Sequence, residues 1–260
     1  MDSSSAFLVA VGIVVAAKTL AWLLQLRSGN AGIVDAIWAW SLGGLAVWFA
    51  STGSADPLLR LAIGVMGGVW GLRLGWHLWL RNWGAAEDWR YAGFRARWGA
   101  QANRNMWFFF QFQNLFTLML AASAFWGPAF GDGRATPLTL VMAAAVWLTS
   151  VVGESIADTQ LETFRRDPVN RGQVCDRGLW GWSRHPNYFF ETVHWLAYAV
   201  LAWGSSDWAW TLVAPLVMAF LLLKMSGLPI LEAGLVERKP GYADYMRRTS
   251  AFIPLPPKKS

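Results

Sequence analysis

The feature that most constrains this chain is a series of long apolar stretches separated by short polar loops. A helix needs roughly 20 mostly apolar residues to cross the hydrocarbon core of a bilayer. Seven stretches qualify, and they cover residues 6–26, 33–51, 58–80, 106–126, 136–156, 188–204 and 207–230. Because lipid offers the backbone no hydrogen bonds, such stretches have to be helical. The sequence therefore predicts an all-α, polytopic membrane protein with seven transmembrane helices.

The composition supports this class and argues against several others. Hydrophobic residues make up 55% of the 260 residues and charged residues 15%, whereas soluble domains are about one quarter charged. The net charge of +6 would suit nucleic acid only if the basic side chains formed one patch, and here they are spread between apolar stretches. The single cysteine, Cys175, cannot form an internal disulfide, and with only three histidines it gives no closed zinc-ligand set. We expect neither a nucleic-acid partner nor a metal.

The basic residues lie in alternate loops. The leader MDSSS and the loops STGSADP and GSSD contain no Lys or Arg, and GPAFGDGRA contains only Arg134. In contrast, the loops 81–105 and 157–187 carry five arginines each. The positive-inside rule therefore places the amino terminus outside and the carboxyl terminus in the cytoplasm. Because the leader has no basic residue, we expect the first stretch to be a retained span, not a cleaved signal peptide.

One apolar stretch contains glycines four residues apart. The segment GVMGGVWGLRLG, residues 64–75, includes the pairs Gly64/Gly68, Gly67/Gly71 and Gly71/Gly75. It lacks the preceding strand and the G-x-G-x-x-G order of a dinucleotide-binding loop. Small residues at this spacing let a second helix backbone approach closely in a membrane. The segment therefore predicts close helix packing.

Ionisable residues also stand inside the apolar stretches, where charge is costly and often functional. They are Lys18, Arg73, His77, Glu154, His194 and Lys224, with Asp35 and Glu191 at the ends of stretches. Lys18 and Lys224 either snorkel to the interface, which is the simpler interpretation, or belong to a functional set. Four residues share one depth with the segment RHPNYFFE, residues 184–191: Arg73, His77, Glu154 and Asp158. Glu154 lies four residues before Asp158, so both occupy one helix face, and Glu191 lies three residues before His194 and shares a face with it in the same way. We therefore predict a polar floor that opens to the cytoplasm.

The loop before that segment has a mixed composition. DPVNRGQVCDRGLWGWSRHPN, residues 167–187, interleaves Arg with Asp, Asn, Gly and Trp. An ordinary positive-inside loop would explain the number of arginines but not the interleaving. Since arginine binds phosphate bidentately, we expect a folded loop over a polyanionic ligand. A serine hydrolase is not indicated, because no G-x-S-x-G turn is present.

Several motifs together resemble the bacterial branch of the steroid 5α-reductase family. They are VDAIWAW (34–40), WGLRLGWHLWLRNWGAAEDWRY (70–91), GESIADTQLETFRR (153–166), GLWGWSRHPNYFFE (178–191), SGLPILE (226–232) and YADYMRRTSAFIP (242–254). The resemblance implies one membrane domain over 1–260, with the substrate mainly in 1–135 and the cofactor mainly in 136–260. It implies a bacterial inner-membrane enzyme that uses NADPH to reduce the C=C bond of a lipophilic enone, such as a 3-oxo-4-ene steroid, by hydride transfer to the β-carbon.

The resemblance also implies which residues serve the reaction. The family pattern matches Asn187, Glu191, Asp158 and Arg165, and the aligned tail adds Tyr245 and Arg248. The motif residues Arg184, His185, Tyr188 and Glu232 complete the candidate cofactor site. Reduction also needs a group that polarises the carbonyl while enolate charge develops. By location and chemistry, the candidates are Asp35, Arg73, His77, Glu87 and Tyr91.

Two other functions fit part of the sequence. Membrane methyltransferases of the isoprenylcysteine and phospholipid type, which use S-adenosylmethionine, share the RHPNY stretch and a tail of the form LE…Y…Y. A non-enzymatic sterol-binding or transport protein is the third possibility, although the inverted repeats typical of transporters are absent from the sequence. For a reductase, the loop arginines favour NADPH over NADH, because a 2′-phosphate suits a bidentate donor. The expected partners are a lipophilic small molecule and membrane lipid, with no obligate protein partner.

Overall fold

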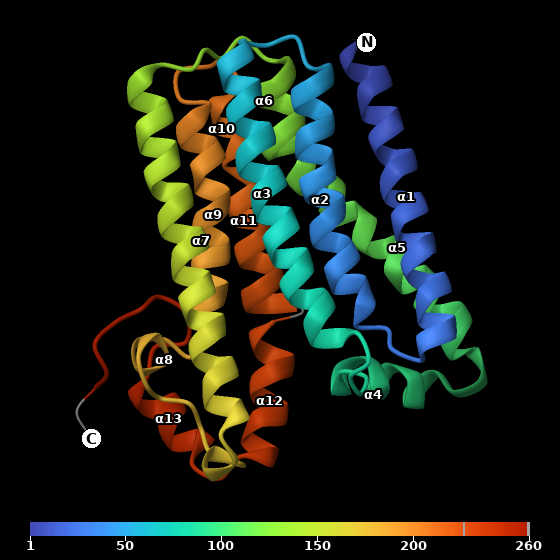
Figure 1. The fold of residues 1–260 in the computed structure, drawn as a ribbon, viewed down its shortest axis with the longest axis vertical. Coiled ribbons are helices and arrows are strands. Elements are labelled where there is room, and N and C mark those ends of the chain that lie inside the picture. The colour runs from blue at the N-terminus through green and yellow to red at the C-terminus, as the bar shows by residue number, and fades with distance from the viewer. Residues whose placement is uncertain (226, 259–260) are drawn as a thin grey trace. The chain divides into compact units, whose positions relative to one another are not determined.

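A computed structural model describes residues 1–225 and 227–258 of the chain, and within them every extended regular element is a helix (Figure 1). Three long helices come first: α1 (Ser3–Ser28), α2 (Ile33–Thr52) and α3 (Pro57–Asn82). A helical run over Trp89–Phe130 follows, comprising α4 (Trp89–Trp98), a 3₁₀ turn (Gly99–Gln101), α5 (Ala102–Ala121), a π-helical turn (Ala122–Trp126) and α6 (Gly127–Phe130). The prediction of an all-α chain is confirmed for the described residues.

The second half of the chain mixes long and short helices. α7 (Pro137–Arg166) is the longest, with 30 residues, and leads through a 3₁₀ turn (Pro168–Asn170) to α8 (Leu179–Trp182) and α9 (Pro186–Leu201). α10 (Trp208–Thr211), α11 (Val213–Phe220) and a π-helical turn (Leu221–Met225) precede α12 (Leu228–Arg238) and α13 (Tyr242–Arg248). Residue 226, inside the predicted stretch 207–230, lies outside the described residues.

Six helical segments in the described part are long and apolar enough to cross a membrane, and they make the chain a multi-pass integral membrane protein. They cover Ser3–Ser28, Ile33–Thr52, Pro57–Asn82, Trp89–Phe130, Pro137–Arg166 and Trp208–Arg238. The predicted stretch 188–204 corresponds to α9, whose 16 residues fall short of the roughly 20 that a span requires. The seventh span is therefore not confirmed.

Local sequence sets several helix ends. Asp2 and Asp56 accept hydrogen bonds from backbone N–H groups in the first turns of α1 and α3, and Pro57 fits the first position of α3 because it has no N–H to satisfy. Gly29 ends α1 with a φ of 70°, a left-handed conformation that glycine adopts without strain. Gly29 thus ends α1, and Asp56 and Pro57 begin α3, so that only short loops connect α1, α2 and α3.

The chain divides into two compact units, which are described separately. The first consists of Met1–Leu140 and Leu201–Ala214, and the second of Val141–Val200 and Pro215–Ser260. In the first unit α2 packs along α3, and α1 packs against α2 and α5. A Cβ atom at Gly71 would lie 2.6 Å from the Cα of Gly43, and one at Gly43 would lie 3.2 Å from the carbonyl oxygen of Gly67. The predicted close helix packing at the glycine repeat is confirmed.

Lys18 on α1 lies inside the first unit. The side chain of Lys18 is fully buried, and its Nζ donates to the Oε1 of Gln113 on α5 over 2.9 Å. Lys18 therefore does not snorkel to the interface, because its ammonium is held inside the unit by a partner 95 residues away. The other lysine, Lys224, is exposed.

In the second unit, the short elements gather at one end of α7 and α9. Figure 1 shows α8, α13 and the carboxy-terminal tail together there. Phe164, Cys175 and Trp180 form a small buried cluster with Leu161 packed against it. This end of the unit contains most residues of the predicted cofactor site.

Candidate functional site

The loop between α7 and α9 folds back onto α7. The indole Nε1 of Trp180 donates to the carbonyl of Ala157 over 2.9 Å, and the amide of Leu179 donates to the Oε1 of Gln160 over 2.9 Å. Gly178 begins the turn with a φ of 58°, and a Cβ there would lie 2.6 Å from the Gln160 side-chain amide. The GLWGW segment is thus a docked turn that fixes where the RHPNY segment begins.

Arg184 is the centre of a polar cluster, here called the Arg184 node, which comprises Arg184, His185, Glu232 and the carbonyls of Met246 and Thr249. The guanidinium donates to both oxygens of Glu232, through Nε over 2.7 Å and Nη2 over 3.1 Å. Its Nη1 donates to the carbonyls of Met246 and Thr249 over 3.0 and 2.7 Å. His185 Nε2 lies 3.1 Å from the Oε1 of Glu232. The node therefore joins the loop, α12 and α13.

Backbone contacts hold the tail to the same loop. The amide of Arg184 donates to the carbonyl of Ser250 over 2.8 Å, beside a parallel β-bridge between Ser183 and Ser250. Ser183 Oγ donates to the carbonyl of Phe252 over 2.8 Å, and the Tyr245 hydroxyl donates to the carbonyl of Trp180. Burial raises the pKa of Tyr245 well above its ordinary value, so this phenol stays protonated as a donor. The segment 245–252 is thereby a fixed part of the site.

Polar side chains continue from the node onto the facing parts of α7 and α9. Asn187 Nδ2 donates to the Oδ1 of Asp158 over 3.2 Å, and the rings of His185 and Tyr188 stack with centroids 5.2 Å apart. Further along α9, Trp195 Nε1 donates to the Oε1 of Glu191 over 3.1 Å. The structure thus brings Asp158 and Asn187 into contact, as expected for one site.

Buried groups extend this polar strip. Glu154, Glu191 and His194 are all buried, and His194 Nε2 lies 3.2 Å from the hydroxyl of Tyr198. The helical spacings of Glu154 with Asp158 and of Glu191 with His194 placed these pairs correctly on two helix faces of the second unit. The larger predicted floor, which also includes Arg73 and His77 of the first unit, stays a prediction.

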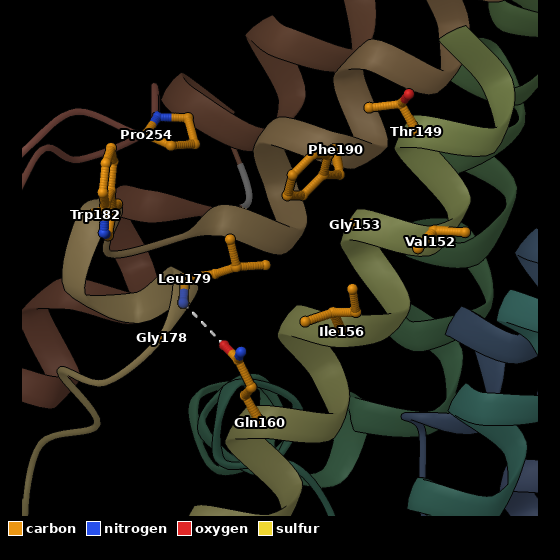
Figure 2. A pocket seen from close by; sticks show the side chains of 10 residues that line it. All are labelled: Thr149, Val152, Gly153, Ile156, Gln160, Gly178, Leu179, Trp182, Phe190 and Pro254. Atoms are coloured by element: carbon orange, nitrogen blue, oxygen red, sulfur yellow. Dashed lines mark hydrogen bonds between the residues drawn. The ribbon is translucent and has the colours of Figure 1, made fainter. Parts of the chain in front are cut away.

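A pocket of about 720 Å³ lies beside the docked turn (Figure 2). Its lining comes from α7, α8, α9 and the tail: Thr149, Val152, Gly153, Ile156, Gln160, Gly178, Leu179, Trp182, Phe190 and Pro254. The lining carries no charge, and only Thr149 and Gln160 have polar side chains. A Cβ at Gly153 would lie 2.4 Å from the ring of Phe190, so glycine lets this ring close one side of the pocket. The volume and the apolar lining suit a small lipophilic molecule.

The remaining predicted cofactor residues lie at the edge of this site. Arg248 Nη2 lies 4.0 Å from the Oδ2 of Asp176, with both side chains nearly half exposed. Arg165 lies in the last turn of α7. The sequence interpretation missed Ser183, Trp180 and Gln160, which position the loop. In the sequence, the only indication of a tight turn here is the pair of glycines on either side of Trp180, Gly178 and Gly181.

Three of the five predicted carbonyl-polarising residues lie in two clusters of the first unit. The Tyr91 hydroxyl donates to the Oδ1 of Asp35 over 2.7 Å, and Arg90 Nη2 lies 3.7 Å from the Oδ2 of the same carboxylate. Glu87 instead accepts from the amide of Ala31 over 2.9 Å and from Arg95 Nη2 over 2.9 Å. The structure therefore joins Asp35 to Tyr91, and Glu87 belongs to a separate ion pair. Arg73 and His77 are half-buried on α3.

These clusters also have a structural role, in which Arg90 and Arg95 are the arginine partners. Arg90 and Arg95 attach α4 to the carboxylates at the start of α2 and in the loop before α4. Asp88 caps α4, and although burial acts to raise the pKa of this carboxyl, hydrogen bonds and charge from Arg90 lower it overall. The acidic candidates of the first unit are consequently bound to arginines of the protein itself.

Comparison with curated proteins finds a relative over part of the chain. The protein described as probable O-methyltransferase ustE, from Ustilaginoidea virens, is 32% identical over 97 residues. The match covers 37% of this chain and 34% of that protein, so it spans about a third of the relative's length. No solved structure matches the chain.

A protein family matches nearly the whole chain and corrects the resemblance drawn from the motifs. The family is described as protein of unknown function (DUF1295), and it matches residues 21–249. The assignment to the steroid 5α-reductase family is wrong, because the matching family is a different one and the curated relative carries a methyltransferase name. Since the match covers far more than half of the sequence, this chain belongs to the DUF1295 family.

Proposed function

We propose that this protein is a membrane methyltransferase that uses S-adenosylmethionine to methylate an oxygen atom of a lipophilic acceptor. One observation carries the proposal. The two sequence features shared with membrane methyltransferases, RHPNY and LE…Y…Y, meet in the Arg184 node, where Arg184 and His185 bind Glu232 and where Tyr245 binds the loop. The printed name of the relative, probable O-methyltransferase, supports the same chemistry.

The charges around the node fit a cationic cofactor better than a polyphosphate. Glu232 neutralises Arg184, and the remaining donors of that guanidinium are directed to two backbone carbonyls. Arg184 is therefore engaged by the protein and does not offer its guanidinium to a phosphate. Beside it, Asp158 and Asn187 offer oxygen atoms to an ammonium group, and the stacked rings of His185 and Tyr188 offer aromatic faces to a sulfonium cation.

S-adenosylmethionine, when bound, supplies a methyl group that is electrophilic because it is attached to a positively charged sulfur. The residues of this chain would orient the acceptor and keep water away. The apolar pocket would hold the body of the acceptor, with Trp182 and Phe190 in its lining. Gln160, fixed by the amide of Leu179, marks its polar end. An acceptor in this position needs one oxygen atom and an uncharged, apolar body.

Ligand-dependent stability separates this proposal from the reductase. A ligand that binds only the folded state raises the unfolding temperature. We expect S-adenosylmethionine and S-adenosylhomocysteine to raise the Tm of the purified protein and NADPH to leave it unchanged. Asn187→Ala should remove the shift, whereas Arg166→Ala, which alters an exposed pair with Glu162, should keep it. A shift with NADPH alone would overturn the proposal and support reduction of an enone, which stays a prediction.

We also propose that the chain crosses the membrane seven times with its amino terminus outside. Six long apolar segments support most of this count, and α9 would supply the remaining crossing with residues from its flanking turns. The alternation of basic and non-basic loops supports the orientation. In this arrangement the Arg184 node faces the cytoplasm, where S-adenosylmethionine is available.

A further inference from the structure

The side chain of Lys18 places an amine inside the first unit without a carboxylate at ion-pair distance. It is fully buried, and its one hydrogen bond within the described part of the chain is the 2.9 Å contact with Gln113. No carboxylate of the described residues lies within ion-pair distance of it; the charge of Asp35 acts on it only from farther away, and Asp35 itself is bound by Tyr91, Arg90 and Arg81. An ammonium has three N–H donors, so Lys18 retains donors that Gln113 does not use.

Other polar groups line the same seam between α1 and α5. Gln111 Nε2 donates to Thr19 Oγ1 over 3.1 Å, and Asn114 Nδ2 donates to Gln111 Oε1 over 2.9 Å. The Oδ1 of Asn114 is buried and has no hydrogen-bond partner among the described residues, and the same holds for the Nε2 of Gln25 one turn beyond Ala21. The seam thus contains both donors and acceptors that the protein leaves unused.

A purely structural role does not account for Lys18. Hydrogen bonds between membrane helices contribute about 1 kcal/mol, whereas an unpaired buried cation costs several kcal/mol. A glutamine–glutamine or apolar contact would join α1 to α5 at lower cost. A buried lysine without a counter-ion tends to lose its proton, and it is stable as an ammonium only when a partner of opposite charge completes the site.

We propose that the seam between α1 and α5 binds the carboxylate of a lipophilic acid, with Lys18 as its counter-ion. Gln113 is half-buried, so its side chain can turn aside and let a carboxylate reach Nζ from the bilayer. The outer faces of both helices are apolar and exposed, through Leu20 and Ile13 on α1 and Phe112 and Leu115 on α5, and they suit a hydrocarbon chain. This binding site is separate from the proposed methyl transfer.

A carboxylate fits the seam better than a phosphate. Phosphate recognition commonly uses the bidentate fork of arginine, and Arg95, the α4 arginine that contacts Gln25 of α1 and Asn103 of α5, is also engaged by Glu87. Lysine provides one compact charge, which matches a single carboxylate. The ligand class is therefore a fatty or isoprenoid acid and not a phospholipid.

Photo-crosslinking in lipid nanodiscs tests this assignment. The full chain, in neutral phosphatidylcholine discs, would be labelled with a diazirine analogue of palmitic acid and, in parallel, with its methyl ester. We expect the acid to label peptides of α1 and α5 about tenfold more than the ester, the ratio for one charge-assisted hydrogen bond. Lys18→Met should reduce labelling by the acid to the level of the ester, and Lys224→Met should leave it unchanged.

The outcomes are distinct. Lys18→Met replaces a buried charge by an apolar side chain of similar length, so it is expected to fold, and its Tm reports whether it does. Equal labelling by acid and ester, or unchanged labelling of a folded Lys18→Met protein, overturns the proposal. A lowered Tm with unchanged labelling assigns Lys18 to structure alone. An alkyl phosphate that competes better than palmitate overturns the choice of carboxylate.

Discussion

Arg184 illustrates how a residue can belong to a functional site without touching a ligand. Its guanidinium binds Glu232 bidentately and two carbonyls of the segment after α12, with only 9% of the side chain exposed. A buried ion pair that loses one partner leaves an uncompensated charge, which is strongly destabilising. Arg184 therefore positions the loop and the tail around the stacked rings of His185 and Tyr188.

The first prediction concerns this ion pair. Arg184→Gln should lower the free energy of unfolding by about 3 kcal/mol, because Glu232, which is mostly buried, then loses its bidentate partner and keeps only His185. Thermal unfolding followed by tryptophan fluorescence measures the loss, and limited proteolysis shows whether the tail is released. Arg247→Gln is the matched control, since its pair with Asp244 is exposed and should contribute little. Similar losses in both variants would contradict a central role for the node.

Cys175 gives a second prediction at this scale. Burial raises the pKa of its thiol, so at a given pH the thiolate, the reactive form, is less populated than in an exposed cysteine. In folded protein, maleimide should react more slowly with Cys175 than with a cysteine introduced by Arg171→Cys at an exposed position. The rate at Cys175 should still be rising at pH 9, when the exposed thiol approaches its maximum. Equal rates between pH 7 and pH 9 would show that Cys175 is accessible.

Which contacts could be predicted depended on sequence separation. The pair Glu154 and Asp158 is spaced one helical turn apart, and the helix period alone puts both on one face. Arg184 and Glu232 are separated by 48 residues, and no local spacing indicates that they meet. The hydrogen-bond partner of Lys18 could not be predicted for the same reason, because Gln113 lies on another helix, 95 residues away.

At the scale of elements, the close packing of α2 against α3 depends on glycines, which have no side chain. A Cβ at Gly71 would lie 2.6 Å from the Cα of Gly43 and 2.7 Å from the carbonyl oxygen of Ala39, and backbone cannot move aside cheaply. Gly44, one residue along α2, has open space around its Cβ direction. Gly43 and Gly44 are adjacent on α2, and they differ in that α3 lies against Gly43 but not against Gly44.

The third prediction uses that difference. Gly71→Ala should destabilise the protein by about 1–3 kcal/mol, the usual cost of overpacking. Gly44→Ala should be neutral or stabilise by up to about 1 kcal/mol, because alanine favours a helix. Unfolding in detergent or in nanodiscs compares the two variants directly. If both substitutions are neutral, the two helices do not pack as closely as the glycine contacts indicate.

Element boundaries were harder to predict than element types. Hydropathy extended the sixth stretch to residue 204, but α9 ends at Leu201, and Gly204 adopts a φ of 88° in the turn that follows. Apolar residues continue through this turn, so composition cannot mark where the helix stops. Pro128 similarly follows the π-helical turn at Ala122–Trp126, a change of helix type that an apolar pattern does not reveal.

At the scale of the whole molecule, composition predicted the class of protein and a motif misled about the family. A charge content of 15% and repeated apolar stretches indicated a helical membrane protein, which the six long segments bear out. The set of motifs that includes RHPNY indicated a reductase, although the Arg and His of RHPNY bind Glu232 of the same chain. A motif that shapes a loop can serve several chemistries, so it constrains the local fold more than the reaction.

The last prediction tests the membrane topology as a whole. In a Cys175→Ala background, cysteines would be introduced one at a time by Ser54→Cys, Arg171→Cys and Ser206→Cys, all at exposed positions. A membrane-impermeant maleimide should label positions 54 and 206 in intact cells, and position 171 only after permeabilisation. Position 206 decides the number of spans, because it lies after α9: if α9 does not cross, 206 stays on the same side as 171. Labelling of 206 only after permeabilisation would leave six spans or fewer, and labelling of 171 from outside would reverse the orientation and move the Arg184 node away from the cytoplasm.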